Sequence, residues 1–218
     1  MYRYMIRWKQ KIMGCSLLIS IYEIKPKFQK LLMPIVKWMR NIGMTPNQVT
    51  ILALLLSIVT GAVLSVFHDN KWIYILMPIV MFVRMALNAI DGVMAKKYNM
   101  KSKLGLLLNE LGDVISDVCL FIPFLFIAHD FGVGIILFIA LSIISEMAGV
   151  TVQVIGSSRR YDGPMGKSDR AFIVGLISFL IFVQLNVIPY LHFVFYICSI
   201  LMIVNIYNRI NKGLEEAK

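Results

Sequence analysis

The sequence predicts an all-α integral membrane protein with six transmembrane helices, preceded by an amphipathic helix at the membrane interface. Composition is the first observation behind this class: the 218 residues are 59% hydrophobic and 16% charged, with a mean hydropathy of +0.77. Such a chain has too little polar surface for a soluble enzyme of its size. The second observation is that apolar residues gather in runs of about 18 or more, the length a helix needs to cross a bilayer. The third is the placement of the positive charges.

Six apolar runs separated by short connections define the expected spans. We therefore expect one compact membrane domain at residues 45–210, between a cytoplasmic N-terminal segment at 1–44 and a cytoplasmic tail at 211–218. The runs occupy residues 48–67, 72–90, 104–128, 131–155, 171–186 and 188–208.

The 22 lysines and arginines alternate between the two sides of this bundle. Nine precede the first span, four lie in the second connection, four in the fourth and three after the last span. The first connection holds one, the third and fifth hold none, and Arg84 lies inside the second span. Because positive residues concentrate in cytoplasmic loops, both termini are expected in the cytoplasm of a multi-pass inner or plasma membrane protein. Topology thus explains the net charge of +10, and no nucleic-acid partner is expected.

Residues 25–40 carry the pattern of a helix that lies in the interface on anionic membrane lipids. Its apolar and basic side chains fall largely on different sides of a helical wheel. A helix that binds a soluble partner is the alternative. The apolar positions are Phe28, Leu31, Leu32, Ile35, Val36 and Met39, and the basic positions are Lys27, Lys30, Lys37 and Arg40.

The residues that predict chemistry are carboxylates and amides near the cytoplasmic ends of the second and third spans, because ionisable groups at membrane depth are costly and commonly functional. Asn88 and Asp91 share one helix face, and Asn109, Asp113 and Asp117 follow at spacings of four. The short turn between these spans makes them antiparallel, so the two faces can confront each other. Their oxygen ligands suit Mg²⁺ or Mn²⁺. A buried hydrogen-bond cluster is the alternative.

This pattern resembles the motif of the CDP-alcohol phosphotransferases, also called CDP-alcohol phosphatidyltransferases. The family carries D-x-x-D-G-x-x-A-R, eight residues, and then G-x-x-x-D-x-x-x-D across its second and third spans. Every spacing matches between Asn88 and Asp113. The stretch TPNQVT at residues 45–50 is similar to the family's entry motif, and the resemblance covers about residues 30–210.

The resemblance implies transfer of a phosphate-linked alcohol from a CDP-linked lipid donor, commonly CDP-diacylglycerol, to a small alcohol acceptor, with release of CMP. It implies two divalent ions, Mg²⁺ or Mn²⁺, at the four aspartate positions, which are Asn88, Asp91, Asn109 and Asp113 here. Asp113 inherits the role of the base that takes the acceptor's proton. A homodimer is implied as well. The residues that the resemblance assigns to CDP binding are Asn47, Thr50, Gly92, Ala95, Lys96 and Gly105.

The chain departs from the family motif at three positions, because Asn88 and Asn109 replace aspartates and Lys96 replaces the arginine. An amide oxygen can ligate a hard cation but brings no charge. The four metal positions therefore carry two negative charges rather than four. Lys96 still supplies a positive charge, without the two-pronged geometry of an arginine.

Two further acids could compensate for the lost charge. Asp117 lies one helical turn beyond the last motif aspartate and Glu110 lies on the flank of that face, so a shifted site of four carboxylates is one alternative. The other alternative for Asp117 is an ion pair with Arg84, which lies about two turns deeper in the second span than Asp91. For Glu146, in the fourth span, we expect an ion pair with Arg84.

The fourth connection, residues 157–170, combines basic residues with two glycines and a proline on the side of the predicted site. Such a segment can cradle a phosphate, and in the family it resembles the place where a phosphorylated acceptor docks. A purely topological charge signal is the alternative. The candidate ligands of an acceptor phosphate are Arg159, Arg160, Lys167 and Arg170.

Two other functions stay open beside a metal-dependent transferase of phospholipid biosynthesis. A catalytically silent homologue that binds lipid or nucleotide would account for the two asparagines. A small transporter would account for Arg84 and Glu146 at membrane depth. Against a transporter, the chain has no inverted repeat, and its polar groups gather at one interface rather than at the midplane.

Overall fold

The computed structural model describes residues 15–127 and 132–218, with side chains from residue 28 onward, and its described residues are helical with no strand. The longer helices are joined by turns and by short 3₁₀ segments. The α-helices are α2 (Cys15–Asn41), α3 (Pro46–Val66), α4 (Leu76–Lys97), α5 (Lys103–Phe121), α6 (Pro123–Ile127), α7 (Gly132–Thr151), α8 (Lys167–Phe182) and α9 (Leu191–Glu216). The 3₁₀ segments are η1 (Lys71–Ile75), η3 (Val152–Ile155) and η4 (Ile188–Tyr190).

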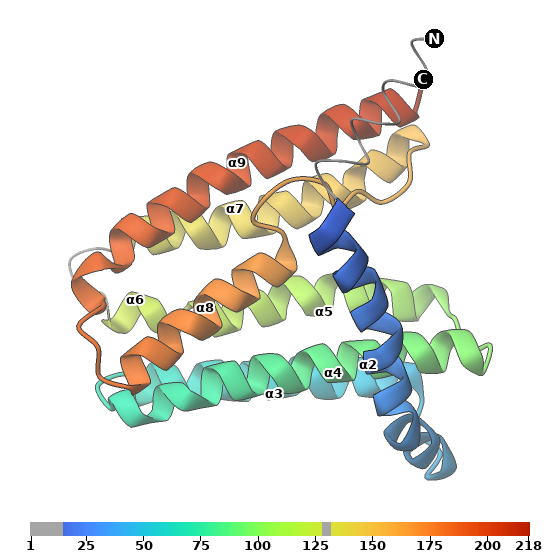
Figure 1. Cartoon of the computed structure of the whole chain (residues 1–218), viewed down its shortest axis with the longest axis horizontal. Helices are drawn as coiled ribbons and strands as arrows, with labels where there is room; N and C mark the ends of the chain where they lie inside the picture. Colours follow the sequence, from blue (N-terminus) through green and yellow to red (C-terminus); the bar gives the residue numbers. More distant parts are fainter. Residues whose placement is uncertain (1–14, 128–131) are drawn as a thin grey trace.

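The long helices of the bundle run roughly along one direction, and α2 crosses α4 at a steep angle (Figure 1). Helix α3 packs against α4 and α5, α8 packs against α4, and α7 packs against α5 and α9. The C-terminal ends of α4, α7 and α9 therefore lie at the same end of the molecule as the N-terminal ends of α3 and α5 (Figure 1). Asn88, Asp91 and Asn109 lie toward these ends of α4 and α5.

The protein is a membrane protein, because four stretches in the described part of the chain are long and apolar enough to cross a bilayer. The helices at the other two expected spans do not meet this description, since α8 has only 16 residues and α5 carries several charged residues in its first 15. The six-span count therefore stays a prediction. The four stretches are Pro46–Val66, Lys71–Lys97, Gly132–Ile155 and Ile188–Glu216.

The expected third span, 104–128, is broken in the structure, where α5 ends at Phe121 and α6 begins at Pro123. Proline has no amide hydrogen, so it cannot donate to the carbonyl of Cys119 four residues earlier. At this level the backbones of α3 and α5 come close together: a Cβ built on Gly61 would lie 2.1 Å from the Cys119 carbonyl oxygen. A glycine at position 61 is thus required for the packing of these two helices.

We expect Gly61→Ala to destabilise the protein by about 1–3 kcal/mol, because an added methyl group must push the helices apart. Gly112→Ala in α5 is the matched control, since its Cβ would first meet an atom at 3.9 Å, an ordinary contact. Thermal unfolding in detergent measures both variants. Equal midpoints for the two would contradict the close approach at Gly61.

The helix expected at residues 25–40 forms the second half of α2, and its apolar face is divided between two environments. Leu32 and Val36 are buried against the start of α3 and the end of α4, whereas Leu31, Ile35 and Trp38 are exposed. A membrane contact of α2 would therefore use the exposed set, and the interfacial position stays a prediction. Of the expected N-terminal segment 1–44, residues 1–14 lie outside the described part of the chain.

Candidate active site

The carboxylates and amides of α4 and α5 face each other, as the antiparallel arrangement of these helices predicts. The side-chain amide of Asn88 donates a hydrogen bond to Asp113 Oδ1 at 3.2 Å. Arg84, one turn earlier on α4, donates to the backbone carbonyl of Asp113 at 3.1 Å. The tight turn between the helices is fixed by Ser102, which caps α5 by accepting a hydrogen bond from the Gly105 amide at 2.9 Å.

The stretch at residues 45–50 builds the start of α3 and brings it to the same place. Thr45 and Gln48 form a capping box, in which Thr45 Oγ1 accepts from the Gln48 amide and Gln48 Oε1 accepts from the Thr45 amide at 2.8 Å. With the helix start fixed in this way, the hydroxyl of Thr50 donates to Asp91 Oδ2 at 2.7 Å. The entry motif therefore has a structural role as an N-cap and also contacts a motif aspartate.

The glycines assigned to CDP binding differ in their surroundings. A Cβ built on Gly105 would lie 2.7 Å from the side-chain oxygen of Asn47, so these two predicted residues are in contact. A Cβ built on Gly92, next to Asp91, would meet nothing within 4 Å. Gly92 thus borders open space that a larger ligand can fill. Two further residues assigned to CDP binding lie near the end of α4, where Ala95 is half-buried and Lys96 is exposed.

A polar cavity of about 450 Å³ joins the motif residues to the fourth connection. Asn88, Asn109 and Asp113 lie on one side of it, and residues of the 157–170 segment lie on the other. This segment therefore faces the motif rather than serving only as a charged loop. The lining includes Glu146, Arg159, Tyr161, Gly163, Gly166, Lys167, Ser168, Asp169 and Arg209.

Of the four candidate phosphate ligands, two line the cavity and two do not. Lys167 forms an ion pair with Asp113, and Arg159 pairs with Glu110 and, at 3.2 Å, with Glu146; both basic residues line the cavity. Arg160 is not part of the lining and pairs with Asp162 at 2.7 Å and Glu216 at 2.8 Å. Arg170 is fully buried and pairs with Asp117 at 3.1 Å and Glu146 at 2.9 Å.

Asp117 forms the ion pair with Arg84 that the sequence left as one of two alternatives. The closest atoms, Arg84 Nη1 and Asp117 Oδ1, are 2.7 Å apart, and both side chains are buried. The second carboxylate oxygen accepts from Arg170. Each oxygen of Asp117 is therefore already bound to a guanidinium.

Glu146 forms ion pairs, but the expectation that its partner is Arg84 is wrong. Its carboxylate pairs with Arg159, Arg170 and Arg209, the last at 3.4 Å. The reason is the packing of the helices: α7 lies against α5 and α9, whereas Arg84 points from α4 toward α5. A spacing argument within one pair of helices cannot detect this difference.

Arg209 is the residue of the cavity that the sequence argument missed. It projects from α9, donates to the backbone carbonyl of Ser145 and is almost fully buried. One turn earlier, Asn205 is buried as well and accepts a hydrogen bond from Ser145 at 2.8 Å. Polar residues four apart near the C-terminal end of the last apolar run were therefore a usable signal, of the same kind as Asn88 and Asp91.

Contacts outside the cavity hold the 157–170 segment against the C-terminal end of α9. Asp162 accepts from Arg160 and from Lys212, each at 2.8 Å. Partial burial tends to raise the pKa of Asp162, but the hydrogen bonds from Lys212 and Arg160 outweigh it and hold that pKa below its usual range. These contacts therefore persist at neutral pH and are lost only as Asp162 becomes protonated in acid.

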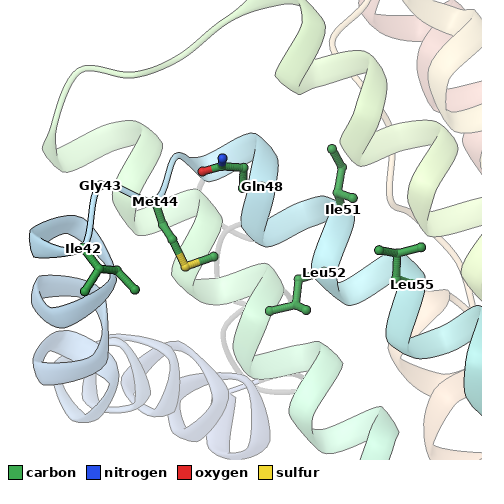
Figure 2. Close-up of a pocket in the computed structure, with 7 residues that line it drawn as sticks. All are labelled: Ile42, Gly43, Met44, Gln48, Ile51, Leu52 and Leu55. Atoms are coloured by element: carbon green, nitrogen blue, oxygen red, sulfur yellow. The ribbon is translucent and has the colours of Figure 1, made fainter.

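A second hollow, of about 370 Å³, lies where the chain passes from α2 to α3 and is mainly apolar. Figure 2 shows Ile51, Leu52 and Leu55 projecting from α3 beside Ile42 and Met44. It shares no lining residue with the polar cavity. Of the four metal positions of the motif, Asn88, Asn109 and Asp113 line the polar cavity, and Asp91 is in neither lining.

The donors at the four motif positions fit one hard cation but not two. They are two carboxylates, Asp91 and Asp113, and two amides, Asn88 and Asn109, with two negative charges in all. In the described part of the chain, no three side chains of His, Cys, Asp or Glu are grouped so that they could hold a metal ion. A second ion would lack the charge that a pair of divalent cations requires.

Residues 43–207 match the family model described as CDP-alcohol phosphatidyltransferase. The chain belongs to this family. The resemblance read from the motif spacing is therefore confirmed, and with it the broad class of transferases that act on CDP-linked alcohols.

Two relatives of the chain are similar to it in sequence. The chain is 40% identical over 191 residues to the inner membrane protein YnbA of Escherichia coli K12, which covers 88% of this chain and 94% of YnbA. It is 33% identical over 95 residues to the archaetidylinositol phosphate synthase of Pyrococcus horikoshii, covering 44% of this chain and 48% of that protein.

Solved structures of the phosphatidylinositol phosphate synthase PgsA1 of Mycobacterium tuberculosis share the fold. The form with CDP-DAG bound gives a TM-score of 0.70 at 20% identity, covering 84% of this chain and 94% of that one. The form in complex with manganese and citrate gives 0.71 at 19% identity, covering 83% and 88%.

Proposed function

We propose that the protein transfers a phosphate-linked alcohol, in the form of a phosphatidyl group, from CDP-diacylglycerol to a small alcohol acceptor and releases CMP. The observation that carries this proposal is the single polar cavity shared by Asn88, Asn109 and Asp113 with the basic residues Arg159 and Lys167. Family membership supports the reaction class, and the structural relative with CDP-DAG bound supports the lipid-linked donor.

The nucleotide of the donor would lie along α3 and the facing ends of α4 and α5. Asn47 and Gly105 are in contact there, and Gly92 borders open space. Thr50 donates a hydrogen bond to Asp91, which would hold that carboxylate in place for the diphosphate. Ala95 and Lys96 would flank the same group. A divalent ion, Mg²⁺ or Mn²⁺, held by Asp91, Asp113 and the two asparagine amides would neutralise the diphosphate when bound.

Asp113 would act as the base. The acceptor's hydroxyl oxygen forms a bond to the phosphorus that carries the diacylglycerol, the bond from this phosphorus to the bridging oxygen breaks, and CMP leaves with that oxygen. The hydroxyl proton passes to the Asp113 carboxylate, which Asn88 orients through Oδ1. Lys167 pairs with Asp113 and so places a positive charge beside this carboxylate.

The cations of the cavity favour an acceptor that carries a phosphate. Arg159, Lys167 and Arg209 all line it, and guanidinium groups bind phosphate oxygens in two-pronged fashion. We expect Arg159→Gln to raise the KM for a phosphorylated acceptor about tenfold or more and to leave the KM for CDP-diacylglycerol unchanged.

Arg160→Gln is the matched control for this experiment, because Arg160 is the next residue in the chain but pairs outside the cavity. Steady-state kinetics in detergent with a phosphorylated polyol as acceptor compare the two variants. An equal rise in KM for both would show that the 157–170 segment acts only as a scaffold.

The reaction is tested by CMP release from CDP-diacylglycerol with purified protein in micelles, over a panel of phosphorylated and free alcohols. Acceptor-dependent CMP release is the expected result. Nucleotide binding without CMP release for any acceptor would favour the second candidate, a catalytically silent homologue, for which Asn88 and Asn109 are the supporting observation. The homodimer and the cytoplasmic orientation of both termini belong to the same proposal.

A further inference from the structure

We infer that this site takes one divalent cation rather than two, and that the ammonium group of Lys167 stands beside Asp113 where a second cation would otherwise lie. The inference rests on the proposed function, since it concerns the same motif positions. A chain with two of its four metal-site aspartates replaced can in this way still present a charge-balanced site to a CDP-linked donor.

The four donor side chains carry little negative charge. Asp91 and Asp113 bring two negative charges, and the amides of Asn88 and Asn109 bring none. Before the donor binds, one divalent cation balances these two charges, whereas two would leave an excess of two positive charges at the end of a membrane helix bundle. Uncompensated charge in such surroundings is costly.

Cationic side chains already lie beside the carboxylate of Asp113. Its Oδ1 accepts from Asn88 and lies 3.6 Å from Arg84 Nη2, and its Oδ2 pairs with Lys167. An ammonium group on a carboxylate oxygen supplies the positive charge that a second metal ion would otherwise bring there. Asp91 differs, because its hydrogen-bond partner among the described side chains is the neutral hydroxyl of Thr50. The single cation held by the four motif positions is therefore expected nearer to Asp91 than to Asp113.

The neighbouring acids already form ion pairs with arginines. Asp117 has one oxygen bound to Arg84 and the other to Arg170. Glu110 pairs with Arg159, and Glu146 with three arginines in the described part of the chain. The shifted site of four carboxylates would require these ion pairs to break. The acids around the cavity thus neutralise arginines instead of replacing the charge lost at Asn88 and Asn109.

The test counts Mn²⁺ ions bound per chain by electron paramagnetic resonance, with the full-length protein in detergent and CDP present. We expect one ion for the wild type and two for the Asn88→Asp, Asn109→Asp double variant. Asn99→Asp is the matched control, because Asn99 lies exposed in the turn between α4 and α5 and adds a negative charge outside the donor set; it should keep one ion.

Two ions, or none, on folded wild-type protein would overturn the inference, as would a count for the double variant equal to that of the wild type. Lys167→Gln provides an independent readout should the double variant fail to fold. Removing the ammonium from Asp113 should tighten Mn²⁺ binding about tenfold or more, and unchanged or weaker binding would contradict the role given to Lys167. CDP binding is measured on the same samples, so that a failure of the proposed function, no CDP bound, is distinguished from a wrong ion count.

Discussion

Asp113→Asn is expected to lower the rate of CMP release by about 10²–10⁴-fold, the contribution typical of a positioned general base. The amide keeps the size of the carboxylate and can still be contacted by Asn88 and Lys167, but it cannot take the acceptor's proton. Single-turnover measurements with CDP-diacylglycerol and a saturating acceptor give the rate of the chemical step.

Asp169→Asn is the matched control for this variant, because Asp169 also lines the cavity but serves to cap α8. It accepts a hydrogen bond from the Gly166 amide at 3.0 Å, and asparagine can accept the same bond. Its rate should therefore stay close to that of the wild type. A similar loss in both variants, or a near-normal rate for Asp113→Asn, would remove Asp113 from the role of the base.

Glu146→Gln is expected to destabilise the protein by about 3–5 kcal/mol, the cost of breaking a buried ion pair on one side. Glu146 is buried and pairs with Arg159, Arg170 and Arg209. Without its charge, Arg209 loses its acidic partner among the described residues, and Arg170 keeps only Asp117. The packing of α7, α8 and α9 around the cavity should loosen as a result.

Thermal unfolding in detergent measures this effect, with Glu216→Gln as the control. Glu216 also pairs with an arginine, Arg160, but at the exposed end of α9, and exposed pairs contribute little to stability. The midpoint for Glu146→Gln should fall well below that of Glu216→Gln. Similar midpoints would mean that the buried arginines do not depend on Glu146.

The core of the site was predictable from local rules. Residues three and four apart share a helix face, and a short turn makes consecutive spans antiparallel. These two facts bring Asn88 opposite Asp113, as the structure has it. The start of α3 was also readable, because the Thr45 and Gln48 pair follows a capping-box pattern.

The partners of the buried charges were not predictable in the same way. Glu146 and Arg209 lie on helices separated by another helix in the sequence, and only their packing side by side brings them together. The same holds for Lys167, which could be recognised as basic and loop-borne but not as the partner of Asp113. The close backbone approach at Gly61 was not predictable either, because it depends on how α3 packs against α5.

The most direct test of the account is calorimetric binding of CDP to the detergent-purified protein, with Mg²⁺ or Mn²⁺ and again with a chelator. We expect metal-dependent binding that is lost in the Asp91→Ala, Asp113→Ala double variant. Gly92→Leu should lose it too without unfolding, because its side chain fills the open space beside Asp91. A folded wild type that does not bind CDP, or a double variant that binds it equally well, would contradict a CDP site at the facing ends of α4 and α5.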